Sequence, residues 1–83
     1  MNKILIEVFL PAANKSFEIY IPLELKIHEV TFLVARSVSE LSNGLFKSSD
    51  DSILCERDSG NILNVNMSAK ELGLKNGSKL MLL

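Results

Sequence analysis

The feature that most constrains the fold is an amphipathic stretch from Ile27 to Leu41, which is flanked on both sides by segments with the alternating pattern of β-strands. Apolar side chains recur in this stretch at three- and four-residue intervals, at Ile27, Val30, Val34, Val38 and Leu41. This spacing places them on one stripe of a helix. A lone helix must bury its stripe against another element, and the strands are the only large partner in the chain. The stretch therefore predicts one helix packed on a sheet.

Composition and charge limit the classes of function. The chain has 83 residues, of which 47% are hydrophobic, and this predicts a single folded domain over residues 1–83. Nine Lys and Arg residues stand against ten Asp and Glu residues, without a basic stripe, so a nucleic-acid partner is not expected. No apolar run is long enough to cross a membrane, and Met1–Lys3 leads into a strand pattern rather than a signal peptide. We expect a cytoplasmic protein without membrane insertion.

The strand pattern predicts the order of the sheet. Residues 3–10 and 16–21 alternate, and the turn at residues 11–15 joins them into a hairpin. Residues 53–56 and 62–63 predict two short strands, and residues 78–83 predict the last one. Because the first and last strands are the most apolar, we expect them side by side and parallel in the centre of the sheet. The predicted core consists of Ile4, Ile6, Val8, Phe17, Ile19, Ile21, Val30, Val34, Leu80 and Leu82.

Two shorter segments complete the prediction. After the helix stop at Asn43–Gly44, we expect Leu45 and Phe46 to pack under the core and Lys47–Ser52 to form a surface loop. The spacing of Ser68 and Glu71 is that of a capping box, which predicts one helical turn.

This order of elements resembles the β-grasp fold of ubiquitin. Residues 17–21 stand where the second strand of ubiquitin turns core residues inward, and the stripe from Ile27 to Val34 matches its helix without a gap. The resemblance implies an α+β fold in which a mixed sheet of four to five strands packs on one α-helix.

The ending Leu72–Leu83, with the sequence LGLKNGSKLMLL, resembles that of the small bacterial ubiquitin-like proteins called YukD or EsaB, which are encoded with type VII secretion systems. The resemblance implies a non-enzymatic accessory or regulatory protein with a protein partner, such as a secretion-system component. Ubiquitin and its sulfur-carrier relatives end in Gly-Gly, whereas this sequence ends at Leu83 within a predicted strand. Conjugation is therefore not expected; the alternative is a modifier or sulfur carrier seen as a truncated chain.

The residues that could carry catalysis or bind metal lack partners. His28 is the only histidine, which leaves no His cluster for zinc and favours a surface role. Cys55 has no predicted His neighbour, and we expect it to be buried as a small apolar residue. Asp50–Asp51 lacks the alternating acidic pattern of a calcium loop, and Gly60 and Gly77 fall in hairpin turns that do not bind phosphate. We expect no enzyme activity, cofactor or metal.

The first candidate surface for protein binding is the back of the helix. Phe32 falls nearly opposite the buried stripe, with Leu33 and Arg36 beside it. An aromatic side chain on the polar face of a helix is either a contact residue or covered by a neighbouring loop.

The second candidate is the outer face of the sheet. We expect Leu5, Met81 and Leu83 to lie within reach of one another on adjacent strands there, joined by Leu54 and Phe9. The resemblance favours this face, because ubiquitin presents its main apolar patch on it. A homodimer through either surface is the alternative to a different protein partner.

Overall fold

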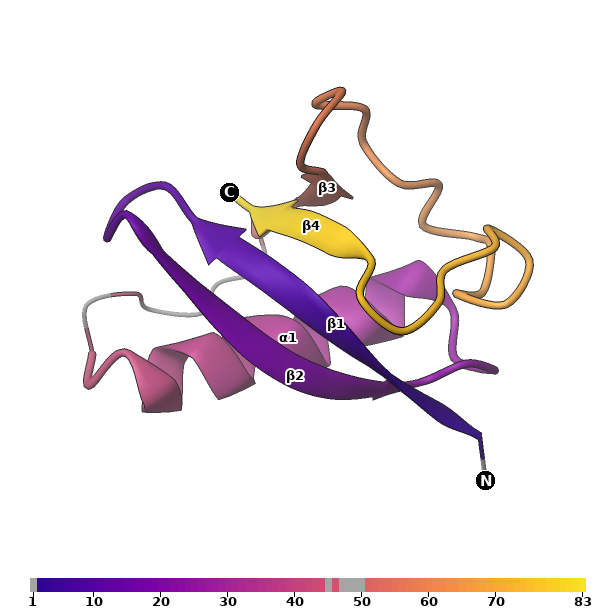
Figure 1. The fold of residues 1–83 in the computed structure, drawn as a ribbon, viewed down its shortest axis with the longest axis horizontal. Coiled ribbons are helices and arrows are strands. Elements are labelled where there is room, and N and C mark those ends of the chain that lie inside the picture. The colour runs from indigo at the N-terminus through magenta and orange to yellow at the C-terminus, as the bar shows by residue number, and fades with distance from the viewer. Residues whose placement is uncertain (1, 45, 47–50) are drawn as a thin grey trace.

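One helix lies across one face of a four-stranded sheet in the computed structural model, which describes residues 2–44, 46 and 51–83 (Figure 1). In chain order the elements are β1 (Lys3–Leu10), β2 (Lys15–Pro22), α1 (Ile27–Leu41), β3 (Leu54–Glu56) and β4 (Lys79–Leu82). The α+β class is as predicted, and the helix has the bounds that its apolar spacing indicates.

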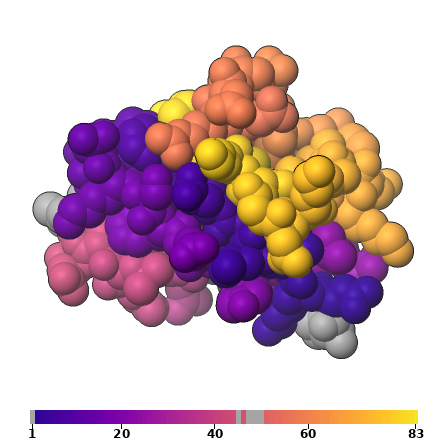
Figure 2. All heavy atoms as spheres, viewed as in Figure 1, coloured from indigo at the N-terminus to yellow at the C-terminus, as the bar shows by residue number. Residues whose placement is uncertain are grey.

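The strand order is β2-β1-β4-β3, with β1 and β4 in the centre. These two strands are parallel, as their apolar sequences predict, and the other two pairings are antiparallel. Figure 2 looks onto the outer face of the sheet, where segments from the two ends of the sequence, indigo and yellow, lie side by side. The turn between β1 and β2 contains Asn14 at a φ of 51°, a left-handed conformation that asparagine tolerates.

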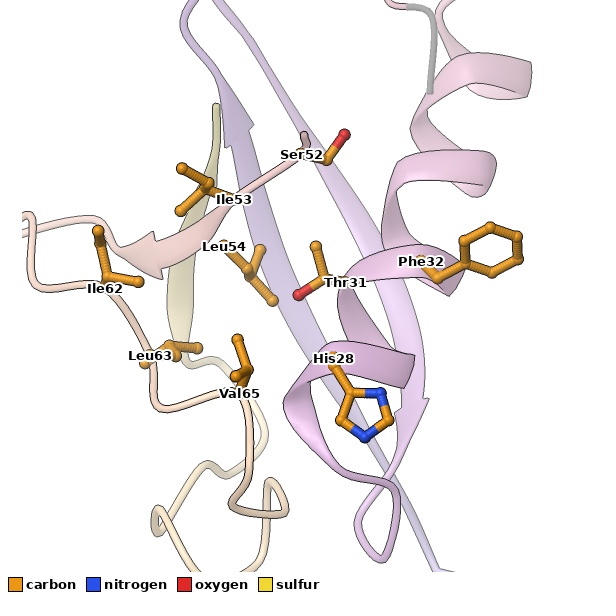
Figure 3. A pocket seen from close by; sticks show the side chains of 9 residues that line it. All are labelled: His28, Thr31, Phe32, Ser52, Ile53, Leu54, Ile62, Leu63 and Val65. Carbon is orange, nitrogen blue, oxygen red and sulfur yellow. The ribbon is translucent and has the colours of Figure 1, made fainter. Parts of the chain in front are cut away.

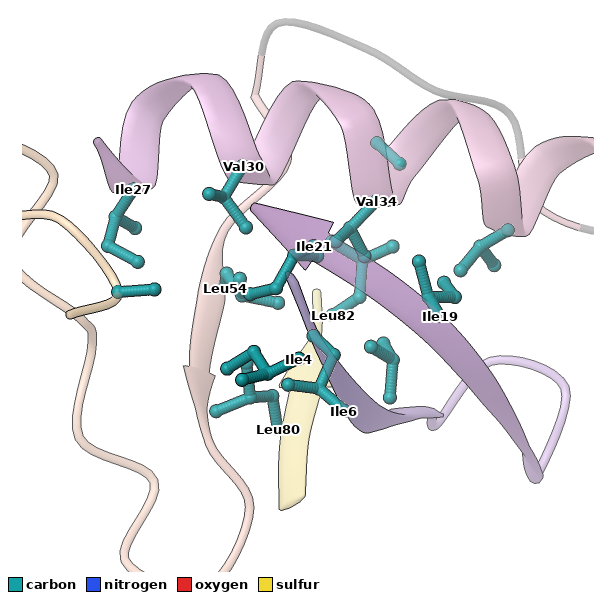
Figure 4. Packing of buried hydrophobic residues seen from close by; sticks show 14 of the residues in the cluster. Ile4, Ile6, Ile19, Ile21, Ile27, Val30, Val34, Leu54, Leu80 and Leu82 are labelled. Carbon is teal, nitrogen blue, oxygen red and sulfur yellow. The ribbon is translucent and has the colours of Figure 1, made fainter. Parts of the chain in front are cut away.

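The core lies between the sheet and the stripe of α1 (Figure 4). Every predicted core residue is buried except Phe17, which is partly buried against the same cluster. One position of the predicted stripe differs: Leu41 is 55% exposed because it ends the helix, one turn beyond the buried Val38. Ala35, for which no prediction was made, is buried beside Val34.

The segment between α1 and β4 is less regular than predicted. The strand expected at residues 62–63 is a single bridge between Cys55 and Ile62. The capping box forms, since the Ser68 N–H donates to Glu71 Oε1 (3.0 Å) and the Glu71 N–H to Ser68 Oγ (3.1 Å), but it closes a turn rather than a named helix. Phe46 packs against the core as expected, whereas Leu45 and residues 47–50 lie outside the described part of the chain.

Backbone carbonyls from a distant segment cap the N-terminus of α1. Its N-cap residue, Lys26, makes no capping hydrogen bond with its side chain. Instead, the Ile27 N–H donates to the Met67 carbonyl oxygen (2.8 Å) and the His28 N–H to that of Val65 (3.2 Å). The first N–H groups of a helix have no partner within it, so these bonds satisfy two donors that would otherwise need water. They also fix residues 65–67 against the start of the helix.

Val34 tests the phase of the helix, because its side chain is fully buried under the sheet. We expect Val34→Ala to lower the free energy of unfolding by about 1–3 kcal/mol through the cavity it leaves. Val65→Ala removes the same atoms from a side chain that is 48% exposed and should cost less than about 0.5 kcal/mol. Urea denaturation measures both values, and equal losses would contradict the assigned phase.

The capping box predicts a dependence of stability on pH. Hydrogen bonds from the backbone and side chain of Ser68 lower the pKa of Glu71 below its ordinary value of 4.5. The unfolded chain therefore binds this proton more readily than the folded one, so the stabilisation is complete above pH 4.5 and is lost as pH falls through the lowered pKa. Glu71→Gln keeps an acceptor but removes the charge. We expect wild type to exceed this variant in urea midpoint at pH 7 and to lose that advantage at pH 3; an unchanged difference would contradict the assignment.

Candidate protein-binding groove

An apolar groove runs between α1 and the segment that contains β3 (Figure 3). Its volume is about 330 Å3. We call it the α1–β3 groove, and its lining residues are His28, Thr31, Phe32, Ser52, Ile53, Leu54, Ile62, Leu63 and Val65.

The groove exists because one helix is narrower than the sheet it covers. A helix with its side chains is about 10 Å wide, whereas four strands spaced about 4.8 Å apart span roughly 14 Å between the outer backbones and more with their side chains. The helix packs against β2, which leaves the β3 side of the inner face open. Leu54 of β3 is buried there, and residues 62–65 form the outer wall.

Hydrogen bonds hold the outer wall in place at both ends. The Leu63 N–H donates to the Leu54 carbonyl oxygen (3.2 Å), and the Glu56 N–H donates to that of Asn61 (2.9 Å). At the other end, Val65 accepts the bond from the N-terminus of α1 described above. The wall is therefore tied to both β3 and the helix.

Exposed apolar side chains are concentrated along this groove. Among the described residues, eight large hydrophobic side chains are exposed, and four of them line the groove: Phe32 (56%), Ile53 (40%), Ile62 (66%) and Val65 (48%). Clusters of this kind mark interaction sites more often than scattered single residues do.

Phe32 stands at the border of the groove rather than inside it. Figure 3 shows Phe32 pointing outward from α1, away from the wall that carries Leu54 and Val65. It also lines an adjoining shallow hollow together with Leu25, His28, Glu29 and Leu33. The structure thus places Phe32 in the open, as the helical wheel predicts, and extends the apolar surface across the back of the helix.

Charges are sparse on this surface. Among the residues that the structure describes, no Lys, Arg, Asp or Glu lines the α1–β3 groove, and Glu29 is the one charged residue that lines the adjoining hollow. Arg36 lines neither, although its guanidinium carbon lies 5.8 Å from the centre of the Phe32 ring, within the range of a cation–π contact.

The prediction that Leu5, Met81 and Leu83 form one cluster on the outer sheet face is wrong. The register pairs Met81 with Phe9, and the Leu5 carbonyl instead accepts a hydrogen bond from the N–H of Gly77 (2.8 Å). Leu5 therefore lies four residues along β1 from the partner of Met81, or roughly 13 Å. Leu83 lies two residues further along on the side away from Leu5. Leu54 faces the core and is not part of the outer face.

An arginine covers the part of the outer face where Phe9 and Met81 meet. The guanidinium carbon of Arg57 lies 4.4 Å from the centre of the Phe9 ring, and its Nη1 atom lies 3.1 Å from Glu7 Oε2. Cys55, opposite Met81, is fully buried, and burial raises the pKa of its thiol. The thiol is therefore poorly suited to act as a nucleophile.

Residues 2–44, 46 and 51–83 were also compared with the requirements of a metal site and of a membrane-spanning helix. No three His, Cys, Asp or Glu side chains in these residues are grouped so that they could hold a metal ion, and no helix there is long and apolar enough to cross a bilayer. His28 and Asp51 are exposed, whereas Asp50 lies outside the described residues.

Comparison with known proteins gives matches in structure but not in sequence. Neither a scan against models of protein families nor a search of curated proteins gave a match. The ubiquitin-like domain of EccD1, a type VII secretion protein of Mycobacterium tuberculosis, is similar with a TM-score of 0.77 and 13% identity over 100% of this chain and 99% of that domain.

Two further structures show the same fold. One is a chain of the MycP5-free ESX-5 inner membrane complex, with a TM-score of 0.75 and 16% identity over 100% of this chain but 21% of that one. The other is the ubiquitin-like domain of Plasmodium falciparum Dsk2, with a TM-score of 0.73 and 16% identity over 98% of this chain and 96% of that domain. The chain has the ubiquitin-like β-grasp fold. The resemblance seen in the sequence is thus confirmed at the level of the fold.

Proposed function

We propose that this chain is a non-enzymatic, ubiquitin-like interaction module that serves as an accessory or regulatory component of a bacterial type VII secretion system in the cytoplasm. The observation that carries the proposal is the α1–β3 groove, where four exposed apolar side chains gather on a ubiquitin-like scaffold. The similarity to the EccD1 domain and the YukD- or EsaB-like ending of the sequence support the secretion context.

The chemistry of the groove suits binding better than catalysis. Its polar side chains are His28, Thr31 and Ser52, and the Thr31 hydroxyl is engaged with the Ile27 carbonyl oxygen at 2.8 Å. No carboxylate or thiol from residues 2–44, 46 and 51–83 lines the groove beside His28, where it could take part in general acid–base or nucleophilic catalysis. Six of the nine lining residues are apolar, and backbone hydrogen bonds hold the outer wall, so these side chains lose little conformational entropy on binding.

Of the two surfaces expected from the sequence, the helix side is the better candidate for the interface. Phe32 is exposed at the border of the groove, with Arg36 against its ring. On the sheet face, Leu5, Met81 and Leu83 are separated along the strands, and Met81 is partly covered. A contiguous apolar surface with an aromatic anchor is the pattern of an interface hot spot.

The proposal also holds that the chain is not attached covalently to other proteins. Its four glycines, at positions 44, 60, 73 and 77, are never adjacent, so the Gly-Gly pair of ubiquitin-like modifiers does not occur in these 83 residues. The alternative of a modifier or sulfur carrier would require that pair in residues beyond this sequence.

Affinity purification from the native host tests the interface. We expect the tagged chain to recover a protein component of the secretion system, and Phe32→Glu to lower that recovery about tenfold, because a charge replaces an apolar anchor. Tyr20→Glu is the matched control, since Tyr20 is an aromatic residue exposed to 67% on the sheet. Loss of recovery with Leu5→Glu but not with Phe32→Glu would place the interface on the sheet face instead. Recovery of no secretion component would contradict the proposed function.

Immunoblotting of the native protein in its host tests the absence of conjugation. We expect one band at the mass of the free chain, because no Gly-Gly carboxylate is present for activation in this sequence. A ladder of heavier species that survives boiling in denaturant and reductant would show covalent attachment and support the modifier alternative.

A further inference from the structure

We propose that the α1–β3 groove binds an amphipathic α-helix of a partner protein, which inserts apolar side chains into the groove and places a basic residue beside Glu29. This inference rests on the proposed function, because it names the chemistry of the partner that the module would bind. It follows from the apolar area that the groove exposes, from the hydrogen bonds that its wall backbones already make, and from the distribution of charge around it.

The exposed area favours a short segment over a second copy of the chain. From their exposed fractions, Phe32, Ile53, Ile62 and Val65 together present on the order of 400 Å2, about half of the ~800 Å2 that each partner buries in a standard interface. A symmetric dimer of standard size would have to bury a further area of about the same size on each copy, outside the groove. A single helix needs only the groove and its border.

The size of the groove agrees with a few inserted side chains. A cavity of about 150 Å3 holds one benzene ring, so the groove volume of about 330 Å3 has room for roughly two or three apolar side chains. One face of an amphipathic helix presents that number at positions i, i+3 and i+4.

The backbone of the walls excludes the other common mode, in which an extended peptide adds a strand. The outer edge of β3 is already occupied, since Cys55 pairs with Ile62 and the Leu63 N–H donates to the Leu54 carbonyl oxygen. The opposite wall is a helix, whose backbone groups bond within the helix. A ligand in the groove must therefore be recognised through its side chains, which is how a helix binds in a groove.

The negative charge of Glu29, at the border of the groove, favours a partner helix that carries a basic residue there. Glu29 lines the adjoining hollow, is exposed and makes no ion pair with any described residue. Two described cations on or next to α1 are engaged elsewhere: the ammonium of Lys26 donates to the Asn66 carbonyl oxygen (3.1 Å), and Arg36 lies over Phe32. A lysine or arginine on the partner helix would complement the carboxylate of Glu29.

Two synthetic peptides, each about four helical turns long, test the inference. Both carry leucines at i, i+3, i+4 and i+7 and differ only in having lysine or glutamate at the polar positions. They are titrated into the 15N-labelled chain and followed by amide shifts. We expect shifts confined to the first half of α1 and residues 52–65, and binding of the lysine peptide about two- to fivefold tighter than binding of the glutamate peptide.

Matched variants separate the roles of charge and apolar contact. Glu29→Gln should remove the preference for the lysine peptide, whereas Glu40→Gln, on the same helix but lining neither hollow, should keep it. Ile62→Ala with Val65→Ala should weaken binding about fivefold or more, whereas Tyr20→Ala with Leu83→Ala should not. A dispersed amide spectrum shows in each case that the variant is folded.

Several outcomes would overturn the inference. Shifts centred on the outer sheet face around Met81 would place the site there, and equal binding of the two peptides would remove the role of Glu29. Groove shifts on concentrating the chain without peptide would identify a second copy as the occupant. If neither peptide binds while the chain still recovers a secretion component, the helix inference is wrong and the proposed function stands.

Discussion

The structure depends on one constraint: a single helix must cover a four-stranded sheet. The fully buried stripe of α1, from Ile27 through Val30 and Val34 to Val38, provides that cover, and the helix packs chiefly against β2. One helix is too narrow to cover the β3 side as well. The chain closes that side with irregular backbone at residues 62–65 rather than with a second helix. The α1–β3 groove is the space left between α1 and residues 62–65. The constraint that forms the core therefore also forms the candidate site.

The position of the groove is fixed relative to the core because residues 63–67 are bonded to both β3 and α1. The carbonyl groups of Val65 and Met67 cap α1, and the bond between Leu63 and Leu54 ties the same segment to β3. The capping box at Ser68 and Glu71 then fixes the following turn against residues 23–25, through the N–H groups of Ala69 and Lys70. A displacement of the outer wall would therefore break backbone bonds at the start of the helix, and the groove is set by the fold rather than by a free loop.

The regular elements could be predicted from the sequence because their apolar residues recur at fixed intervals. The segments without such intervals could not. Alternation gave β1 and the hairpin, and three- and four-residue spacing gave the bounds of α1. Ile53, Leu54 and Cys55, however, are consecutive apolar residues. Because polar and apolar residues do not alternate there, the sequence does not indicate which of them faces the core. The spacing of Leu5 from Met81 depends on the register of two parallel strands that are 69 residues apart, which no local pattern encodes. The groove unites residues 28–32, 52–54 and 62–65, and only Phe32 carried a signal, as an aromatic residue on a polar face.

Intramolecular contacts change how much apolar surface the outer face of this sheet exposes. The parallel pairing brings Phe9 and Met81 together, which would make an apolar patch in the centre of the sheet. Arg57 stacks on Phe9 and pairs with Glu7, so that patch is used within the molecule to hold the segment after β3. Both side chains of this pair are about one-third exposed, and solvent screening keeps the pair itself weak. Its larger effect is to occupy the ring face of Phe9, which leaves the helix side with the greater share of contiguous apolar surface. The β-grasp framework therefore does not by itself determine which face of a chain carries the exposed apolar surface.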